Sequence, residues 1–125
     1  MAPTDAQRIR HILEAIETIE GRVADLDEPA FVADDVVHDA VLYQLALLGE
    51  AASSLSPEVH ERHPGIPWPQ IVAFRNRIMH EYHSVDLRIV WQTIQRDLPE
   101  LRSAIEDDPA LSQGPSQSPG QEQEP

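Results

Sequence analysis

The sequence predicts an all-α fold, an antiparallel bundle of helices. Apolar residues recur every three to four positions in successive segments, which is the spacing of helices that bury one face. Glycine and proline fall between these segments, where they end one helix and let the chain turn. No segment shows the strict apolar–polar alternation of a β-strand. The predicted helices span residues 5–25, 35–54, 67–80 and 86–107, with a shorter one over 56–62.

The helix predicted over residues 5–25 has a clear start. Thr4 with Gln7 three positions later is typical of a capping box, in which each residue bonds the backbone N–H of the other. Asp27-Glu28-Pro29 then breaks the helical pattern and allows a short turn. Apolar side chains follow helical spacing before that break: Ile9, Ile12, Leu13, Ile16, Ile19 and Val23.

The helix predicted over residues 35–54 is apolar on nearly every side. Asp34 or Asp35 can cap its N-terminus. A helix that is apolar all round either lies at the centre of a bundle or shares a face with a second copy of the chain. Both readings stay open, and in a chain this small the second favours a symmetric homodimer. The apolar residues are Val36, Val37, Ala40, Val41, Tyr43, Leu45, Leu47 and Leu48.

Proline positions define the remaining helices. Ser56-Pro57 opens the short helix, and Pro67 and Pro69 suit the first turn of the helix over 67–80. Asp86 can cap the last helix. Within that helix, Pro99 predicts either a kink or a restart with Asp97 as the new cap.

Composition limits the classes of function. The chain has 125 residues, enough for one domain, and no cysteine, which fits a reducing cytoplasm. We expect no signal peptide and no membrane segment, because the N-terminus and the apolar runs lack the required patterns. The net charge of −13 argues against broad nucleic-acid binding, although all nine basic residues are arginine and two of them lie close together near residue 76. An acidic chain with one cationic cleft fits a selective site.

The composition changes near residue 109. Residues 112–125 contain only glutamine, serine, glycine, proline and glutamate. Such a segment cannot bury enough apolar surface to offset its ordering entropy. We therefore expect a helical domain over residues 1–108 and a disordered tail over 109–125.

One stretch at the end of the 67–80 helix concentrates chemically versatile side chains. It reads Arg75-Asn76-Arg77-Ile78-Met79-His80-Glu81-Tyr82. On an ideal helix Arg75 lies within the apolar stripe, and a buried guanidinium needs an acidic partner or an anionic ligand. Asn76 is four residues before His80 and could orient the imidazole. Arg75 and His80 are roughly 140° apart on a regular helix, so they meet on one ligand only if the helix ends there or a second subunit contributes.

The same residues also allow a purely structural interpretation. Arg77 and Glu81 could form a surface ion pair, Arg75 could pack against a carboxylate, and His80 could be solvated. Two histidine pairs, His60/His63 and His80/His83, have a spacing that can bind metal, but no third ligand accompanies either pair. Solvated histidines are the favoured interpretation there, and we expect neither a metal nor a cofactor.

The pattern of Arg, a polar residue, three further residues, His, one residue and Tyr resembles the signature of the HEPN superfamily, and more closely that of HepT toxins. The resemblance extends over most of residues 4–107. It includes Gly49-Glu50-Ala51 and Pro67-Trp68, and in the last helix it includes Asp86-Leu87-Arg88-Ile89-Val90-Trp91 and Asp97-Leu98-Pro99.

This resemblance implies a homodimeric, metal-independent endoribonuclease that is the toxin of a toxin–antitoxin pair. The family's motif residues map onto Arg75, Asn76, His80 and Tyr82. We expect Arg75 and His80 to be catalytic, and Asn76 and Arg77 to bind RNA, with tRNA and mRNA as candidate substrates. The implied partner is a nucleotidyltransferase antitoxin that silences the toxin by adding AMP to Tyr82.

The chemistry of the residues agrees with that implication. RNA cleavage without metal needs a base for the 2′-hydroxyl, an acid for the leaving oxygen and a cation for the phosphorane. Histidine can act as base or acid near neutral pH, and arginine matches phosphate oxygens with two bonds. A two-fold dimer would bring two copies of His80 into one groove. The alternative is a catalytically inactive HEPN module that uses the same helix to bind a nucleotide or a protein.

Overall fold

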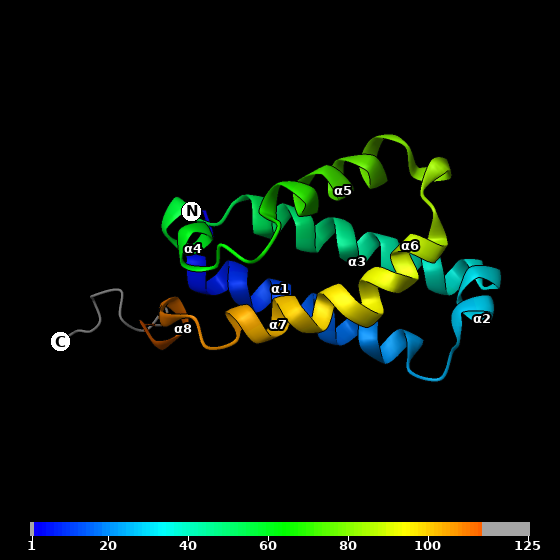
Figure 1. The fold of residues 1–125 in the computed structure, drawn as a ribbon, viewed down its shortest axis with the longest axis horizontal. Coiled ribbons are helices and arrows are strands. Elements are labelled where there is room, and N and C mark those ends of the chain that lie inside the picture. Colours follow the sequence, from blue (N-terminus) through cyan, green and yellow to red (C-terminus); the bar gives the residue numbers. More distant parts are fainter. Residues whose placement is uncertain (1, 114–125) are drawn as a thin grey trace.

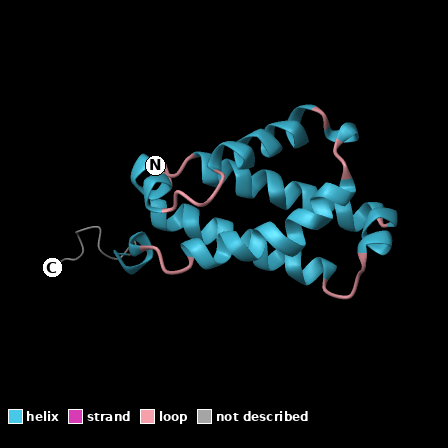
Figure 2. Cartoon of the chain, viewed as in Figure 1, coloured by secondary structure: helices cyan, strands magenta, loops and turns pink. Residues whose placement is uncertain are grey.

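The chain is all-α, as predicted. The computed structural model describes residues 2–113, and within that range every regular element is a helix (Figure 2). The elements in order are α1 (Asp5–Val23), α2 (Glu28–Ala33), α3 (Asp35–Ser53), α4 (Pro57–Arg62), α5 (Trp68–His80), a 3₁₀ turn (Tyr82–Ser84), α6 (Leu87–Gln92), a π-helical segment (Thr93–Asp97), α7 (Leu98–Ile105) and α8 (Pro109–Gln113).

Side-chain caps define the helix starts that the sequence indicated. The capping box of α1 is present: the Gln7 N–H donates to Thr4 Oγ1 at 3.1 Å, and the Thr4 N–H donates to Gln7 Oε1 at 2.8 Å. Asp34, rather than Asp35, caps α3 by accepting from the Val37 N–H at 3.1 Å. The break after α1 contains a full short helix, α2, whose N-cap is Asp27.

Helix α3 lies at the centre of the arrangement. It packs against α1 on one side and α5 on the other, while α6 and α7 run back along the bundle towards α8 (Figure 1). Neighbouring long helices run in opposite directions, so the predicted antiparallel bundle is confirmed. The core between them is formed mainly by isoleucine, leucine and valine, including Ile9, Ile12, Ile16, Ile19, Val41, Leu42, Leu45, Val90 and Ile105.

The last long helix continues through Pro99 without a restart. Asp97 keeps a helical backbone conformation and makes no side-chain capping bond, so the alternative with Asp97 as a new cap was wrong. The turn before the proline widens instead: the Leu98 N–H bonds to the carbonyl of Thr93, five residues back. A π-helical turn of this kind accommodates a residue that has no N–H and whose ring crowds the preceding turn.

Helix α8 corrects the predicted domain boundary. Residues 109–113, expected to begin a disordered tail, form a helix that contacts α1, and Ala110 and Leu111 pack against the core. These two apolar residues precede the purely polar sequence and give α8 a face to bury. The rest of the predicted tail, residues 114–125, lies outside the described residues.

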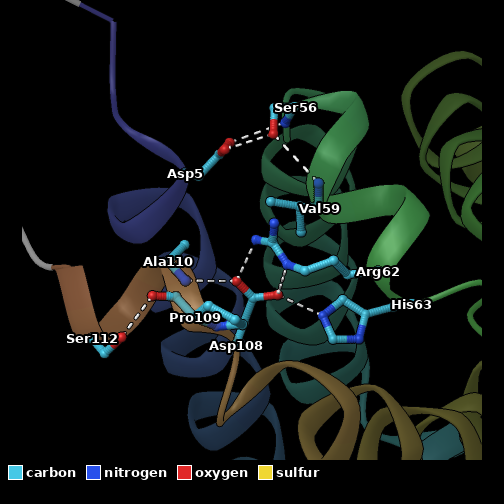
Figure 3. Close-up of polar contacts among 9 residues, drawn as sticks. All are labelled: Asp5, Ser56, Val59, Arg62, His63, Asp108, Pro109, Ala110 and Ser112. Carbon is cyan, nitrogen blue, oxygen red and sulfur yellow. Dashed lines mark hydrogen bonds and ion pairs between the residues drawn. The ribbon is translucent and has the colours of Figure 1, made fainter.

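The buried carboxylate of Asp108 holds α8 in place (Figure 3). Arg62 donates to its two oxygens at 3.1 Å and 2.7 Å, His63 Nε2 lies 2.6 Å away, and the Ala110 N–H donates at 2.8 Å. His63 was expected to be solvated and is instead part of this cluster. Burial alone would raise the pKa of Asp108, but these hydrogen bonds outweigh it and hold the pKa at about 2, below the usual 3.8.

We expect Asp108→Ala to lower the free energy of unfolding by about 2–4 kcal/mol, because it leaves buried donors without an acceptor. The neighbouring exposed residue supplies the control: Asp107→Ala should change stability by less than about 0.5 kcal/mol. Urea denaturation followed by circular dichroism measures both.

The same carboxylate predicts a pH dependence. A pKa that is lower in the folded state stabilises the fold above the unfolded pKa of 3.8, and this stabilisation is lost as pH falls towards 2. Between pH 5 and pH 2 the wild type should therefore lose about 2 kcal/mol more stability than Asp108→Asn. Parallel stability–pH curves for the two proteins would contradict this role.

Candidate functional site

The motif residues lie where α5 ends. The last helical bond of α5 runs from the Glu81 N–H to the carbonyl of Arg77 at 2.8 Å, and Glu81 then leaves helical geometry with φ −138° and ψ 46°. The chain continues as the short 3₁₀ turn that begins at Tyr82. The helix therefore ends directly after His80. By their spacing in the sequence, Arg75 and His80 need either such a helix end or a second subunit to meet on one ligand.

A glycine lets α3 and α5 come into close contact at the motif. A Cβ atom placed on Gly49 would lie 2.5 Å from Cβ and 2.9 Å from Cγ of Arg75. Real side chains do not approach this closely, so the position requires glycine for its lack of a side chain. The stem of Arg75 thus lies directly on the backbone of α3.

Both terminal nitrogens of the Arg75 guanidinium form hydrogen bonds. Nη2 donates to Glu50 Oε1 at 2.6 Å, and Nη1 donates to Asn76 Oδ1 at 2.8 Å. The acidic partner that a half-buried Arg75 was expected to need is therefore Glu50. The sequence allowed Asn76 to orient His80, but its amide oxygen accepts from Arg75, and no hydrogen bond joins Asn76 to His80 within residues 2–113. The remaining N–H groups of the guanidinium are left for an anion.

Arg77 and His80 are exposed and have no side-chain partner in the described part of the chain. Neither side chain makes a hydrogen bond or ion pair within residues 2–113, so the surface pair between Arg77 and Glu81 is not formed. The last turn of α5 thus presents an exposed guanidinium from Arg77 and an exposed imidazole from His80. The guanidinium can attract phosphate, and the imidazole can accept or donate a proton.

Tyr82 is held from the opposite helix. Its hydroxyl donates to Asp39 Oδ1 at 2.5 Å, and 37% of the residue remains exposed. Burial and the charged hydrogen-bond partner together raise the pKa of the Tyr82 phenol to about 12. The phenol is therefore neutral at physiological pH and its ring is accessible at the edge of the motif.

Sequence reasoning did not identify the two carboxylates of α3. Asp39 and Glu50 lie about three helical turns apart and so share one face of α3, which is the face next to α5. They are acidic residues at helical spacing in an otherwise apolar helix, and that spacing is the signal that could have revealed them.

An apolar ridge lies beside these carboxylates. Val36, Tyr43 and Leu47 are 77%, 63% and 46% exposed and follow one another along the outer face of α3. The sequence left open whether the apolar circumference of this helix is central or shared. Two sides of α3 are buried by α1 and α5, and this third side faces solvent.

An apolar cavity lies apart from the motif, and none of residues 75–82 lines it. It has a volume of about 270 Å³, lies between α3, α5 and the last helices, and is lined by residues such as Leu45, Ile71 and Phe74. The described part of the chain contains no group of three histidine, aspartate or glutamate side chains arranged to hold a metal. Among the same residues, none of the helices has the length and apolar character needed to cross a membrane.

Comparison with known proteins identifies relatives over most of the chain. The family model Ribonuclease HepT-like matches residues 12–107. A "Putative RNase" from Caldanaerobacter subterraneus subsp. tengcongensis is 35% identical over 99 residues, which cover 79% of this chain and 88% of that protein. No solved structure matches significantly.

Two archaeal proteins show similar identity. A "Probable ribonuclease HepT" from Thermococcus cleftensis is 33% identical over 98 residues, covering 78% of this chain and 89% of that protein. A "Gamma-glutamylcyclotransferase and putative RNase" from Methanocaldococcus jannaschii is 34% identical over 97 residues, covering 78% of this chain and 44% of that longer protein.

The close contact at Gly49 predicts that Gly49→Ala is destabilising. The added methyl group must push α5 away from α3, which should cost about 1–3 kcal/mol and displace Arg75 from Glu50. Gly21 on α1 is the matched control, because a Cβ there meets no atom within 4 Å. Gly21→Ala should stabilise the protein by up to about 1 kcal/mol. Thermal unfolding of both variants tests the contact, and a neutral Gly49→Ala would contradict it.

Proposed function

The chain belongs to the HepT-like ribonuclease family, and on that premise we propose that it is a metal-independent endoribonuclease, the toxin of a toxin–antitoxin pair. In this proposal RNA is cleaved in a groove of a homodimer by Arg75 and His80. A nucleotidyltransferase antitoxin silences the toxin by adding AMP to Tyr82.

The proposal rests on the contrast between the anchored side chain of Arg75 and the exposed side chain of His80. Arg75 is anchored by Glu50 and Asn76, whereas His80 is exposed and unpaired in the described structure. An anchored guanidinium can hold a phosphodiester in a fixed orientation, and a free imidazole can transfer protons to or from it. Arg77 adds an unpaired positive charge for the RNA backbone.

A homodimer would complete this chemistry. Cleavage needs both an acid and a base, and one chain supplies one motif histidine. The exposed ridge of Val36, Tyr43 and Leu47 lies on the helix that supports the motif, so a two-fold contact there would bring two motifs close together. The dimer groove would then contain two copies each of Arg75, Arg77 and His80, which supports RNA binding by a chain with a net charge of −13.

Addition of AMP to Tyr82 would silence the site by direct competition. Tyr82 lies two residues after the end of the motif helix, and the residue is partly exposed. An attached phosphodiester would place a negative charge and a purine near Arg75 and Arg77 and would occupy the position of the RNA phosphate. Inhibition would then require no change of fold.

We expect the purified protein to cleave RNA in EDTA and His80→Ala to lower the cleavage rate by about 10²–10⁴-fold, the usual contribution of a proton-transfer group. RNA binding should persist, because a neutral imidazole attracts phosphate weakly. His83→Ala removes another exposed histidine from the same region and should retain cleavage. Cleavage that survives in His80→Ala would contradict the role of His80 in proton transfer. A purified wild type that does not cleave RNA would support the alternative assignment, a catalytically inactive HEPN binding module.

Arg75 should affect both binding and cleavage. Arg75→Ala should weaken the two together, and Arg75→Lys should not restore them, since an ammonium group cannot bond Glu50, Asn76 and phosphate with the geometry of a guanidinium. Filter binding and single-turnover cleavage measure the two effects separately. Full activity of Arg75→Lys would contradict the proposed role of the fixed guanidinium.

We also expect light scattering at micromolar concentration to give twice the chain mass of 14.0 kDa. Leu47→Glu places a charge in the middle of the ridge and should give a folded monomer that has lost cleavage. Ile89→Glu is the matched control, because Ile89 on α6 is similarly exposed and lies outside the ridge. A wild-type monomer, or an active Leu47→Glu monomer, would contradict the shared groove.

A further inference from the structure

The two tyrosines of the chain differ in their partners. Tyr43 is 63% exposed, whereas Tyr82 is 37% exposed. In a single chain, accessibility alone would favour Tyr43 as a site of modification, whereas in the proposed homodimer the contact along the ridge would cover it. Only Tyr82 has its hydroxyl bonded to a carboxylate in the described structure.

The hydrogen bond at Tyr82 has the geometry of a nucleophile and its base. The hydroxyl donates to Asp39 Oδ1 at 2.5 Å, within the distance for direct proton transfer. His38 Nδ1 lies 3.2 Å from the same oxygen, and the His38 ring packs edge-on against Phe31 in the core. Asp39 thus extends from a fixed part of α3, while 55% of its side chain is open to solvent and to an incoming ligand.

We propose that Asp39 is the general base that activates Tyr82 for nucleotidyl transfer, and that it selects Tyr82 over the more exposed Tyr43. This inference rests on the proposed silencing of the same site by AMP. It adds a residue of this chain to a reaction in which the partner would bind the nucleotide and its Mg²⁺.

Nucleotidyl transfer exchanges one P–O bond of ATP for another. Tyr82 Oη attacks the α-phosphorus of ATP and forms a new P–O bond, while the bond from that phosphorus to the bridging oxygen of pyrophosphate breaks. The hydroxyl proton moves to Asp39 Oδ1, and pyrophosphate leaves with the electron pair of the broken bond. An aspartate that accepts the proton of an attacking hydroxyl has the same role in protein kinases.

The state of the phenol explains why a base is needed. With a pKa of about 12, Tyr82 is not ionised at neutral pH, so attack must be coupled to loss of its proton. The carboxylate that accepts its hydrogen bond is already in position to take that proton. Tyr43 has no such acceptor within the described residues.

A purely structural role for Asp39 makes a different prediction. If the bond only places the ring, Asp39→Asn should behave as the wild type, because the amide oxygen can still accept from the hydroxyl. If Asp39 takes the proton, Asp39→Asn should fail, because an amide has almost no basicity. The asparagine variant therefore separates placement from proton transfer.

The experiment measures AMP transfer by intact mass under single-turnover conditions, with the purified nucleotidyltransferase of the proposed pair, ATP and Mg²⁺. The partner is titrated to saturation, so that binding and chemistry are separated. Asp39→Asn should lower the saturated rate by at least about 100-fold. Asp35→Asn removes the same charge one turn earlier on α3 and should stay within about twofold of the wild type. Tyr82→Phe should not be modified.

The outcomes distinguish this inference from the proposed function. An Asp39→Asn protein that reaches the wild-type rate at saturation would overturn the base role and leave silencing at Tyr82 intact. Modification of Tyr43 in the wild type would overturn the selection of Tyr82. A wild type that gains no mass would overturn the proposed silencing together with this inference, while the RNA cleavage test would still stand by itself.

Discussion

The close contact between α3 and α5 at Gly49 determines the geometry of the site. Without a side chain at that position the stem of Arg75 can lie on α3, and its head then reaches Glu50, the next residue along the same helix. The same contact brings the end of α5 alongside the start of α3, where Tyr82 meets Asp39. The motif is therefore organised by a backbone approach that one glycine permits and one added methyl group would prevent.

Helix α3 has a different role on each of its sides. Val41, Leu42, Leu45 and Leu48 point inward and form the core, while Asp39 and Glu50 face α5 and hold motif side chains. Val36, Tyr43 and Leu47 face solvent. A helix apolar all round can be central or shared, and the two readings are compatible here. Two sides are buried within one chain, and the third is available to a second copy.

The sequence predicted local features better than distant contacts. Helical spacing and the caps at Thr4 and Asp34 depend on residues three or four positions apart, which a pattern reveals. The need of Arg75 for an acid was also predictable from its place in an apolar stripe. Its identity as Glu50 was not, because the partner lies on another helix and depends on how closely two backbones approach. Asn76 illustrates the same limit: helical spacing allowed it to contact His80, yet the side chain turns to the adjacent guanidinium.

The pairing of Arg75 with Glu50 bears on how so acidic a chain could bind RNA. An ion pair at 2.6 Å cancels much of the long-range attraction of the arginine, so its main contribution to the proposed reaction is a fixed direction for phosphate. Arg77 is unpaired in the described structure, so its charge is available for attraction. One arginine would thus orient the phosphodiester and the other would draw it in. Each chain supplies one Arg75 and one Arg77. Bringing two motifs together would increase the attraction for RNA, while each Arg75 would keep its fixed orientation. This favours a site shared between two copies.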